Sequence, residues 1–339
     1  MSELDDTIRE LNKRFGKNTI ISGDDIISLE VDRIPTGSLS LDIETGGGFP
    51  CGRVVELYGR ESTGKTFIAE KTVAEAQKLG KTCVWIDVEG SFDPVWATTL
   101  GVDVKKLKLA RPETGELACD VLDAVIRSGD CGLVVVDSTA ALLPQKELET
   151  AMEDPEQMGT RAKMINRLTR KLHSALNMKV GEDKLPNDCL VIFINQIREK
   201  IGIIYGSPDT TPGGLGLRHA AAIRVEFRKK WLKDPANEDS IIGQTVNFTT
   251  SKNKTFPPYR RGEFDLFTDG SKKGQINSVR EVFCYGILSG GIIQNDRSYL
   301  IGKEKVVGKE KAVEFLESNP SVVAELKSKI HKFYFEKAK

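Results

Sequence analysis

The stretch GRESTGKT, residues 59–66, decides the fold of this chain. It fits the pattern GxxxxGK[ST], in which glycines let the backbone turn so that successive N–H groups face an anion. An apolar run at 53–58 precedes the stretch and a helical pattern at 65–79 follows it. A helix there adds the positive end of its dipole. The stretch therefore predicts a phosphate-binding loop, and a glycine-containing surface turn is the less favoured alternative.

From about residue 38 the chain alternates between apolar strand patterns and helical patterns. The predicted strands cover 53–58, 82–89, 131–138, 189–196 and 223–229. The predicted helices cover 65–79, 94–100, 114–128, about 160–178, and 215–221. Strands rich in Val and Ile that alternate with helices are typical of a parallel sheet covered on both faces. We therefore predict an α/β fold with a mostly parallel central sheet flanked by helices.

The two ends of the chain depart from this alternation. Residues 3–15 have helical periodicity, and NTIISG (18–23) has the pattern of a short, isolated strand. After about residue 270 the composition shifts to that of a small α/β module ending in a basic helix. We therefore predict three domains: an N-terminal helix and strand at 1–37, a core at 38–270 and a C-terminal α/β domain at 271–339.

Composition sets limits on location and partners. Lys plus Arg and Asp plus Glu both number 49, so nucleic-acid binding would need a local basic face rather than a basic total. No apolar run reaches the roughly 18 residues that span a bilayer, and the acidic N-terminus is unlike a signal peptide. Six cysteines without CxxC spacing indicate free thiols, and three distant histidines offer no metal site. We expect a cytoplasmic protein without a membrane partner.

Two predicted strand ends supply chemistry beside the loop. Lys65 would reach the β- and γ-phosphates of a nucleotide, and Thr66 would bind Mg²⁺. LVVVDS (133–138) places Asp137 at the end of an apolar strand, where a carboxylate can hold Mg²⁺ through water. An aspartate that only forms a turn is the alternative, and the phosphate loop favours the metal interpretation.

The stretch WIDVEG (85–90) brings two more carboxylates to a strand end. Hydrolysis needs a group that positions or activates the attacking water, and we choose Glu89 for this role and a structural role for Asp87. Asp93 is predicted to cap the next helix, with proline at its first turn. The spacing of Trp96 leaves two roles open: stacking on adenine, or filling the core.

Two polar stretches follow predicted strands and point to a switch. FINQIREKIG (193–202) ends a strand with Gln196, which can touch a γ-phosphate, so the loop behind it would sense ATP. The stretch at 149–160 leads into a helix that carries exposed basic residues. Basic side chains with apolar wedges and glycines suit a nucleic-acid backbone and unstacked bases. A solvated helix face beside a loop is the alternative.

These motifs together resemble DNA recombinases of the RecA family, of the bacterial and phage type. The likeness covers about 5–270 closely and the C-terminal module loosely. It is carried by IPTGSLSLDIETGGGFPCGRVVELYGRESTGKT, GKTCVWIDVEGSFDP, RPETGE, VVVDSTAAL, FINQIREKIG, TTPGGLGL and the KNK at 252–254.

The resemblance implies a RecA-like P-loop NTPase core that uses ATP and Mg²⁺. Members assemble head to tail as helical filaments on single-stranded DNA, pair it with homologous double-stranded DNA and exchange strands, with DNA-stimulated ATP hydrolysis. The N-terminal helix and strand would dock on a neighbouring protomer.

The resemblance also implies roles for individual residues. Glu89, Lys65 and Gln196 would be catalytic, and Lys252 and Lys254 would reach the ATP of the adjacent protomer. The implied nucleotide contacts are Gly59, Glu61, Ser62, Thr63, Gly64, Lys65, Thr66, Phe67, Asp93, Trp96, Asp137, Lys252 and Lys254, with Thr66 and Asp137 on the metal. The implied DNA contacts are Met158, Gly159, Lys163, Asn166, Arg170, Arg198, Lys200, Ile201, Gly213, Gly214 and Leu215.

Two departures from the family pattern bear on regulation. His219 replaces an aromatic residue implied to link neighbouring nucleotide sites, which puts subunit coupling in doubt. The C-terminus at 327–339 is basic, whereas many bacterial relatives end in an acidic tail. Rival interpretations are a hexameric helicase motor, which the KNK motif disfavours, and a nucleotide-gated scaffold, which the intact phosphate loop and carboxylates disfavour.

Overall fold

The computed structural model describes residues 2–15, 20, 31–149, 159–180, 185–199, 209–210, 214–234 and 237–336. The chain divides into two compact units, Met1–Asp32 and Arg33–Lys339. In the first, helix α1 (Glu3–Phe15) forms over the predicted residues. The predicted strand at 18–23 lies outside the described residues except for Ile20, whose backbone exchanges two hydrogen bonds with the Asn12 side chain. The predicted domain boundaries stay predictions.

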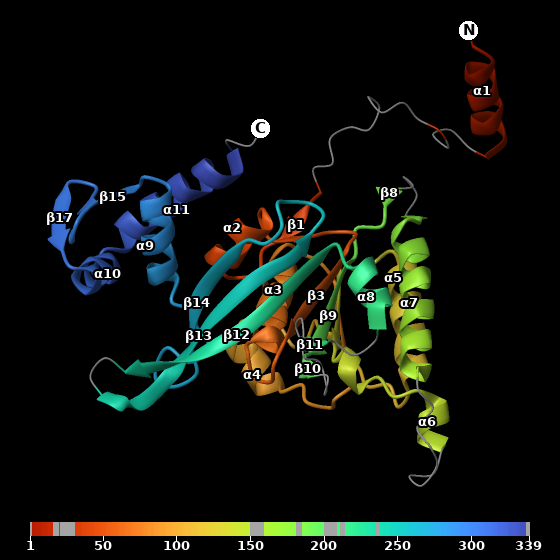
Figure 1. Cartoon of the computed structure of the whole chain (residues 1–339), viewed down its shortest axis with the longest axis horizontal. Helices are drawn as coiled ribbons and strands as arrows, with labels where there is room; N and C mark the ends of the chain where they lie inside the picture. The colour runs from red at the N-terminus through yellow and green to blue at the C-terminus, as the bar shows by residue number, and fades with distance from the viewer. Residues whose placement is uncertain are drawn as a thin grey trace. The chain divides into compact units, whose positions relative to one another are not determined.

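An eight-stranded sheet forms the centre of the second unit, in the order β14-β13-β12-β3-β9-β6-β4-β5 (Figure 1). Neighbours from β12 to β5 in this order run parallel, and β13 and β14 are antiparallel to their neighbours. The strands are β3 (Val54–Gly59), β4 (Cys83–Asp87), β5 (Lys108–Ala110), β6 (Leu133–Asp137), β9 (Leu190–Gln196), β12 (Ile223–Asp234), β13 (Asn237–Asn253) and β14 (Arg261–Phe267). The predicted mostly parallel α/β fold is confirmed.

The strand predicted at 223–229 is the first part of β12, but the rest of β12 and the antiparallel strands β13 and β14 were not predicted, and their composition explains why. The start of β12 is buried and apolar, but beyond Phe227 it is mostly exposed or half-buried. Strand β13 contains TVNFTTSKN, whose polar residues lack the Val/Ile run of a central strand. Val246 and Phe248 of β13 still pack in the core, so the inner part of the hairpin is held by apolar contacts as well as backbone pairing, whereas its outer part lacks an apolar pattern.

Helices cover both faces of the sheet because successive strand residues point to opposite sides. On β4, Cys83 and Trp85 join the buried cluster that includes residues of α3, whereas Val84 and Ile86 join the cluster that includes residues of α5 and α7. The helices of this core are α2 (Leu39–Thr45), α3 (Lys65–Lys78), α4 (Pro94–Thr99), α5 (Gly115–Ser128), α6 (Gln145–Glu149), α7 (Thr160–Leu176), α8 (Gly214–Ala220) and the 3₁₀ turn η2 (Thr139–Ala141). Each predicted core helix is present, within a residue or two at its ends.

Short strand pairs lie between these elements. They are β1 (Arg33–Ile34) with β2 (Phe49–Pro50), β7 (Lys179–Val180) with β8 (Leu185–Pro186), and β10 (Arg198–Glu199) with β11 (Asp209–Thr210). Among the described residues, every helix is too short or too polar to span a lipid bilayer.

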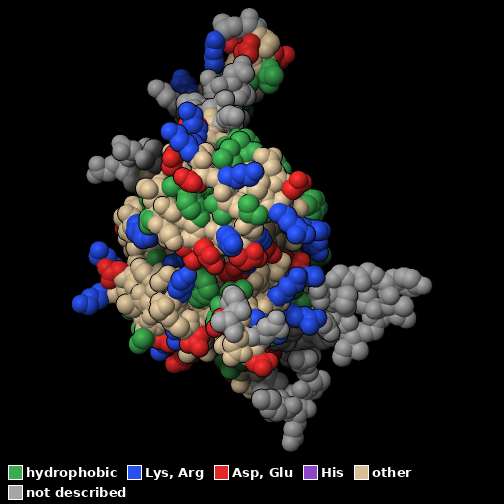
Figure 2. All heavy atoms as spheres, turned by 90° about the vertical axis from the view of Figure 1, so that its left-hand side faces the viewer, with side chains coloured by type: hydrophobic (Ala, Val, Ile, Leu, Met, Phe, Trp, Pro, Cys, Tyr) green, Lys and Arg blue, Asp and Glu red, His purple; other side chains and the backbone are tan. Residues whose placement is uncertain are grey.

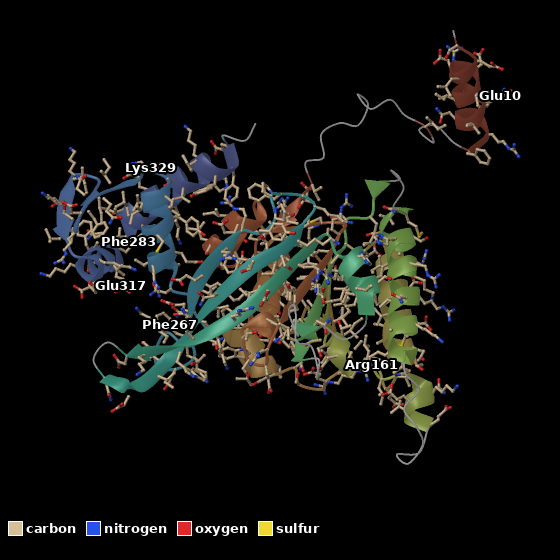
Figure 3. The ribbon with its side chains drawn as sticks, viewed as in Figure 1. Glu10, Arg161, Phe267, Phe283, Glu317 and Lys329 are labelled. Carbon is tan, nitrogen blue, oxygen red and sulfur yellow. The ribbon has the colours of Figure 1, made fainter. Side chains whose placement is uncertain are left out.

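A small α/β module follows the sheet. Its core includes Phe283, which packs edge-on against Tyr299 at 5.0 Å between ring centroids (Figure 3). Its elements are α9 (Ser278–Leu288), β15 (Ile292–Asn295), β16 (Ser298–Ile301), β17 (Glu304–Val307), α10 (Lys309–Ser318), α11 (Pro320–His331) and the π-helical turn η3 (Lys332–Glu336). The face drawn in Figure 2 carries acidic and basic side chains together, in keeping with the balanced composition.

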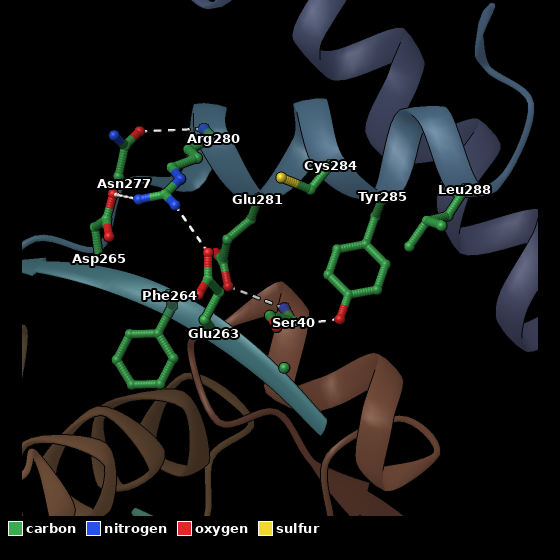
Figure 4. Close-up of a pocket in the computed structure, with 11 residues that line it drawn as sticks. Ser40, Glu263, Phe264, Asp265, Asn277, Arg280, Glu281, Cys284, Tyr285 and Leu288 are labelled. Atoms are coloured by element: carbon green, nitrogen blue, oxygen red, sulfur yellow. Dashed lines mark hydrogen bonds and ion pairs between the residues drawn. The ribbon is translucent and has the colours of Figure 1, made fainter. Parts of the chain in front are cut away.

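Helix α9 lies against α2 and β14 around a cavity of about 150 Å³ (Figure 4). The buried Glu281 carboxylate accepts hydrogen bonds from the Ser38 hydroxyl at 2.6 Å and the Ser40 amide at 2.9 Å. The Tyr285 hydroxyl donates to Glu44 at 3.0 Å. Burial raises the pKa of Glu281 to about 7, because the apolar surroundings disfavour its charged form.

This raised pKa predicts a pH-dependent stability. A carboxyl group that titrates near 4.3 when unfolded and near 7 when folded favours folding at low pH, and this contribution is lost as the pH rises through 7. Glutamine keeps an acceptor oxygen without the charge. The parent protein should therefore lose stability between pH 5 and pH 8 through this group, and Glu281→Gln should not. We expect the free energy of unfolding of Glu281→Gln, relative to that of the parent protein, to be about 2 kcal/mol higher at pH 8 than at pH 5.

Urea unfolding at the two pH values measures this difference. The exposed Glu317→Gln on α10 is the matched control, and it should leave the pH dependence unchanged. A Glu281→Gln effect that is equal at pH 5 and pH 8 would contradict the assignment.

Candidate nucleotide site

The loop between β3 and α3 has the backbone that its sequence predicts. Gly64 caps α3 with φ of 90°, in the left-handed region that favours glycine. A Cβ on Gly59 would lie 2.4 Å from the Phe227 carbonyl oxygen, so a side chain there would displace the neighbouring strand. The first turn of α3 begins directly after the loop, and its unpaired amides are the kind of group that binds phosphate.

Lys65 and Thr66 open helix α3 and lie beside the loop. Lys65 is 6% exposed, its ammonium donates to the Arg60 carbonyl at 2.7 Å, and burial lowers its pKa to about 8. The Thr66 hydroxyl donates to the Asp137 carboxylate at 3.2 Å. A hydroxyl and a carboxylate fit Mg²⁺, which binds oxygen ligands and keeps several of its waters.

The carboxyl ends of β4 and β6 bring acidic groups to the same edge. Burial raises the pKa of Asp137 to about 7, and repulsion from Glu89 adds to the shift. The Val88 amide donates to the Asp137 carbonyl at 2.7 Å, which fixes the two strand ends side by side. A cation held between Thr66 and Asp137 would offset this crowding of negative charge.

Glu89 is oriented by two donors. The Ser138 hydroxyl donates to Glu89 Oε1, and the Gln196 side-chain amide donates to the same oxygen at 3.3 Å. Gln196 pairs in register with Gly59, so the sheet itself carries this amide to the phosphate loop. The arrangement gives a carboxylate of fixed direction, joined to the polar segment that begins after Gln196.

Asp87 and Asp93 organise the segment after β4. Asp87 is buried and accepts from the Ser91 amide at 3.0 Å and from Arg111 Nε at 3.2 Å, a structural role in line with the prediction. Asp93 caps α4 by accepting from the next two helical amides, and proline occupies the first turn as predicted. Trp96 is half-buried, with the Lys273 ammonium 5.7 Å from its ring centroid.

Several other predicted nucleotide contacts lie around this site. The side chains of Glu61 and Ser62 are exposed, and the Thr63 hydroxyl donates to the Arg60 carbonyl at 2.9 Å. The Phe67 ring is buried and lies 6.5 Å from the Phe264 ring, so only its backbone amide is left for a phosphate.

Lys252 and Lys254 lie away from the phosphate loop of their own chain. Lys252 pairs across β12 with Arg224, towards the opposite end of the parallel strands from the loop. Its ammonium donates to the carbonyls of Arg218 at 2.7 Å and His219 at 3.0 Å, both in the last turn of α8. Burial lowers the pKa of Lys252 to about 8, and repulsion from Lys254 contributes.

The predicted DNA contacts are only partly described. Lys163, Asn166 and Arg170 are exposed along α7, which begins after Gly159 in a left-handed conformation. Arg198 belongs to β10, Gly214 begins α8, and Leu215 is exposed. Met158, Lys200, Ile201 and Gly213 lie outside the described residues.

Two residues of the site escaped sequence reasoning. Ser138 was not predicted as a site residue. It follows β6 and donates to Glu89, which follows the adjacent strand β4, and nothing in the local sequence pattern shows this contact. Lys273 reaches the Trp96 ring from the loop after β14, a contact that has no sequence signal.

A phosphate loop and two acidic strand ends on one edge of a parallel sheet define a P-loop nucleotide hydrolase. The model of the RecA N-terminal domain matches residues 2–272. Protein RecA of Psychrobacter arcticus is 41% identical over 327 residues, which cover 95% of this chain and 88% of that protein. Protein RecA of Cereibacter sphaeroides (strain ATCC 17023) is 38% identical over 332 residues, covering 96% and 92%. Protein RecA of Thermotoga sp. (strain RQ2) is 38% identical over 348 residues, covering 98% and 92%.

The chain belongs to the RecA family. It is an ATP-dependent DNA recombinase that acts in DNA repair, and a DNA-dependent ATPase.

Proposed function

We propose that this chain assembles head to tail on single-stranded DNA, pairs it with homologous duplex and exchanges the strands, with ATP as the switch. The contact between Gln196 and Glu89 carries this proposal. Gln196 would meet the γ-phosphate, and Glu89 would position the attacking water. The hydrogen bond between them joins both to the polar segment after Gln196, which would hold DNA. Loss of the γ-phosphate would therefore release that segment.

Each member of the site has a task in this proposal. The Lys65 ammonium neutralises charge that develops on the transferred phosphoryl group, and Glu89 positions the attacking water. Thr66 and Asp137 would hold Mg²⁺, which supplies further positive charge to the phosphates when bound. The Ser138 and Gln196 hydrogen bonds keep the Glu89 carboxylate in one orientation.

Two observations support assembly of many copies. Helix α1 has no buried residue, and Leu4 and Phe15 are 66% and 63% exposed, as suits a helix that docks on a neighbour. Lys252 and Lys254 lie away from their own phosphate loop, where they would be available to the neighbour's ATP. A head-to-tail contact that does not close produces a filament.

None of the six cysteines, all of which lie in the described residues, forms a disulfide bond, and all but Cys284 are buried. This cysteine usage supports a reducing compartment, and we propose a cytoplasmic location.

ATP hydrolysis, measured with and without single-stranded DNA over a range of protein concentrations, tests the proposal. We expect strong stimulation by DNA that rises cooperatively with protein, because each site would be completed at the seam between protomers. Hydrolysis that is indifferent to DNA would separate the polar segments from the phosphate site and favour a nucleotide-gated scaffold.

The exposed cations of α7 give a prediction for DNA affinity. In the double variant Lys163→Ala with Arg170→Ala, we expect weaker binding and a plot of log affinity against log salt that is flatter by about 1–2 units, because two phosphate contacts are lost. Titration of a labelled oligonucleotide over several salt concentrations measures the slope. The same loss of charge in the exposed Lys105→Ala with Lys108→Ala is the control. If both double variants have the parent slope, these α7 residues form only a solvated face.

A further inference from the structure

Arg161 lies in the first turn of α7 and reaches out of its own helix. Its Nη1 donates to the Ala140 carbonyl at 3.2 Å, and its Nη2 donates to the Glu147 carboxylate at 3.4 Å. Figure 3 places Arg161 at the end of α7 nearest α6. The side chain is 26% exposed, so it is partly shielded from solvent. One guanidinium therefore joins α7 to η2 and to α6.

The segment that Arg161 contacts is continuous with the nucleotide site. Asp137 ends β6 and meets the Thr66 hydroxyl, Ser138 donates to Glu89, and the Ser138 carbonyl accepts from the Ala141 amide to close the η2 turn. The carbonyl that Arg161 holds belongs to this same turn. A shift of Asp137 or Ser138 on nucleotide binding would therefore reach Arg161 through a single turn of backbone.

We propose that Arg161 is a positioning residue that couples the nucleotide site to α7, so that occupancy of the one sets the orientation of the other. This inference rests on the proposed function, in which α7 contacts DNA. The coupling would run beside the connection through Gln196, which leads from the same Glu89 carboxylate to the other polar segment. The polar segment before α7 and the polar segment after Gln196 would then both be coupled to the Glu89 carboxylate and the η2 turn.

The chemistry of arginine suits this role. A guanidinium is planar and rigid, so holding two acceptors at once fixes the direction between them, which a lysine ammonium on a flexible stem does not. Arg161 Nε is buried and lacks a hydrogen-bond partner among the described residues. A buried donor without a partner costs free energy. A movement of η2 or α7 that gave Nε an acceptor would therefore be favoured.

A conservative substitution distinguishes the bridging role of Arg161 from that of a cation that only contacts a phosphate. A phosphate contact depends on charge, which Arg161→Lys preserves. The coupling depends on the fork that bridges Ala140 and Glu147, which Arg161→Lys removes. The two roles therefore predict opposite results for this conservative variant.

The experiment measures kcat and KM for ATP, without DNA and at saturating single-stranded DNA, for the parent protein, Arg161→Lys and Arg161→Met. Without DNA, we expect both parameters to stay within about twofold of the parent in each variant. The ratio of DNA-stimulated to basal kcat should fall about fivefold to tenfold in both variants. The salt dependence of DNA affinity should stay unchanged in Arg161→Lys.

Two further variants sharpen the test. Glu147→Gln removes the charge from one partner and leaves the Ala140 carbonyl, so a smaller loss of stimulation, about twofold, is expected. Arg127→Lys on α5 is the matched control, since Arg127 is also paired with a carboxylate, Asp123 at 3.0 Å, but within the described part of the chain it makes no hydrogen bond to η2. It should keep the parent ratio. Thermal unfolding of each variant shows that the fold is intact.

Some outcomes would overturn the inference. Full stimulation of Arg161→Lys at saturating DNA would assign Arg161 a charge role or a purely structural one. A loss in Arg127→Lys equal to that in Arg161→Lys would mean that the effect is general destabilisation. If the parent itself lacks stimulation by DNA, the proposed function fails and this inference fails with it.

Discussion

Replacing Lys65 by alanine is expected to lower ATP hydrolysis by about 100- to 1000-fold, the usual effect of removing one group that stabilises the charge of a transition state. Lys65 is buried at the start of α3, where the interaction of its ammonium with a phosphate would be screened less by salt than at an exposed position. The Lys65 ammonium donates a hydrogen bond to the Arg60 carbonyl. A γ-phosphate would take the place of that carbonyl as the acceptor. Steady-state phosphate release, with and without DNA, measures the loss.

Lys78→Ala is the control for this experiment. Lys78 lies at the other end of α3 in an exposed pair with Glu75 at 2.6 Å, and such pairs contribute little. We expect its turnover within twofold of the parent. Unchanged turnover in Lys65→Ala would refute the assignment of the phosphate site. Among the described residues, Lys65 is the cation in the first turn of the helix after the loop, so no other cation there could replace it.

The gathering of Asp137, Glu89 and Gln196 at one edge of the sheet depends on local sequence and on one topological rule. Parallel strands end on the same edge of a sheet, so any polar residue directly after an apolar run arrives there. Asp137, Glu89 and Gln196 each follow such a run, and the hydrogen bonds among their neighbours bring them to one place. Strand order was not needed to foresee that these three residues would gather.

The parts that were missed depend on tertiary contacts. The Ser138 hydroxyl donates to Glu89, and the Arg161 guanidinium donates to the Ala140 carbonyl. Each partner comes from another element, and no periodicity encodes those pairings. The hairpin of β12 and β13 was missed for a related reason. Its outer part has little buried surface, so the alternation that reveals a half-buried strand is short and is limited on β13 to the stretch around Val246 and Phe248.

The same distinction applies to Phe67. The motif that places Phe67 beside the phosphate loop is a pattern of backbone positions, whereas the side chain belongs to the apolar cluster with Phe264. A motif residue can therefore serve the nucleotide through its amide and the core through its ring. The sequence pattern alone does not separate these two contributions.

Replacing Glu89 by glutamine is expected to lower hydrolysis by about 100- to 10,000-fold, because the attacking water would lose the carboxylate proposed to accept its proton. Glutamine keeps an oxygen that can accept from the Ser138 hydroxyl and the Gln196 amide. Binding of ATP, and of DNA in the presence of ATP, should therefore stay close to that of the parent. Single-turnover hydrolysis and fluorescence anisotropy of a labelled oligonucleotide measure the two properties separately.

The contrast between these two variants tests the switch itself. Lys65→Ala should lose hydrolysis and the ATP-dependent gain in DNA affinity together, whereas Glu89→Gln should stay on DNA because the γ-phosphate is retained. The exposed Glu113→Gln is the control for the loss of one carboxylate near this edge. Hydrolysis by Glu89→Gln within tenfold of the parent would mean that Glu89 only orients Ser138 and Gln196. A Glu89→Gln protein that leaves DNA as quickly as the parent would mean that γ-phosphate occupancy does not hold the polar segments.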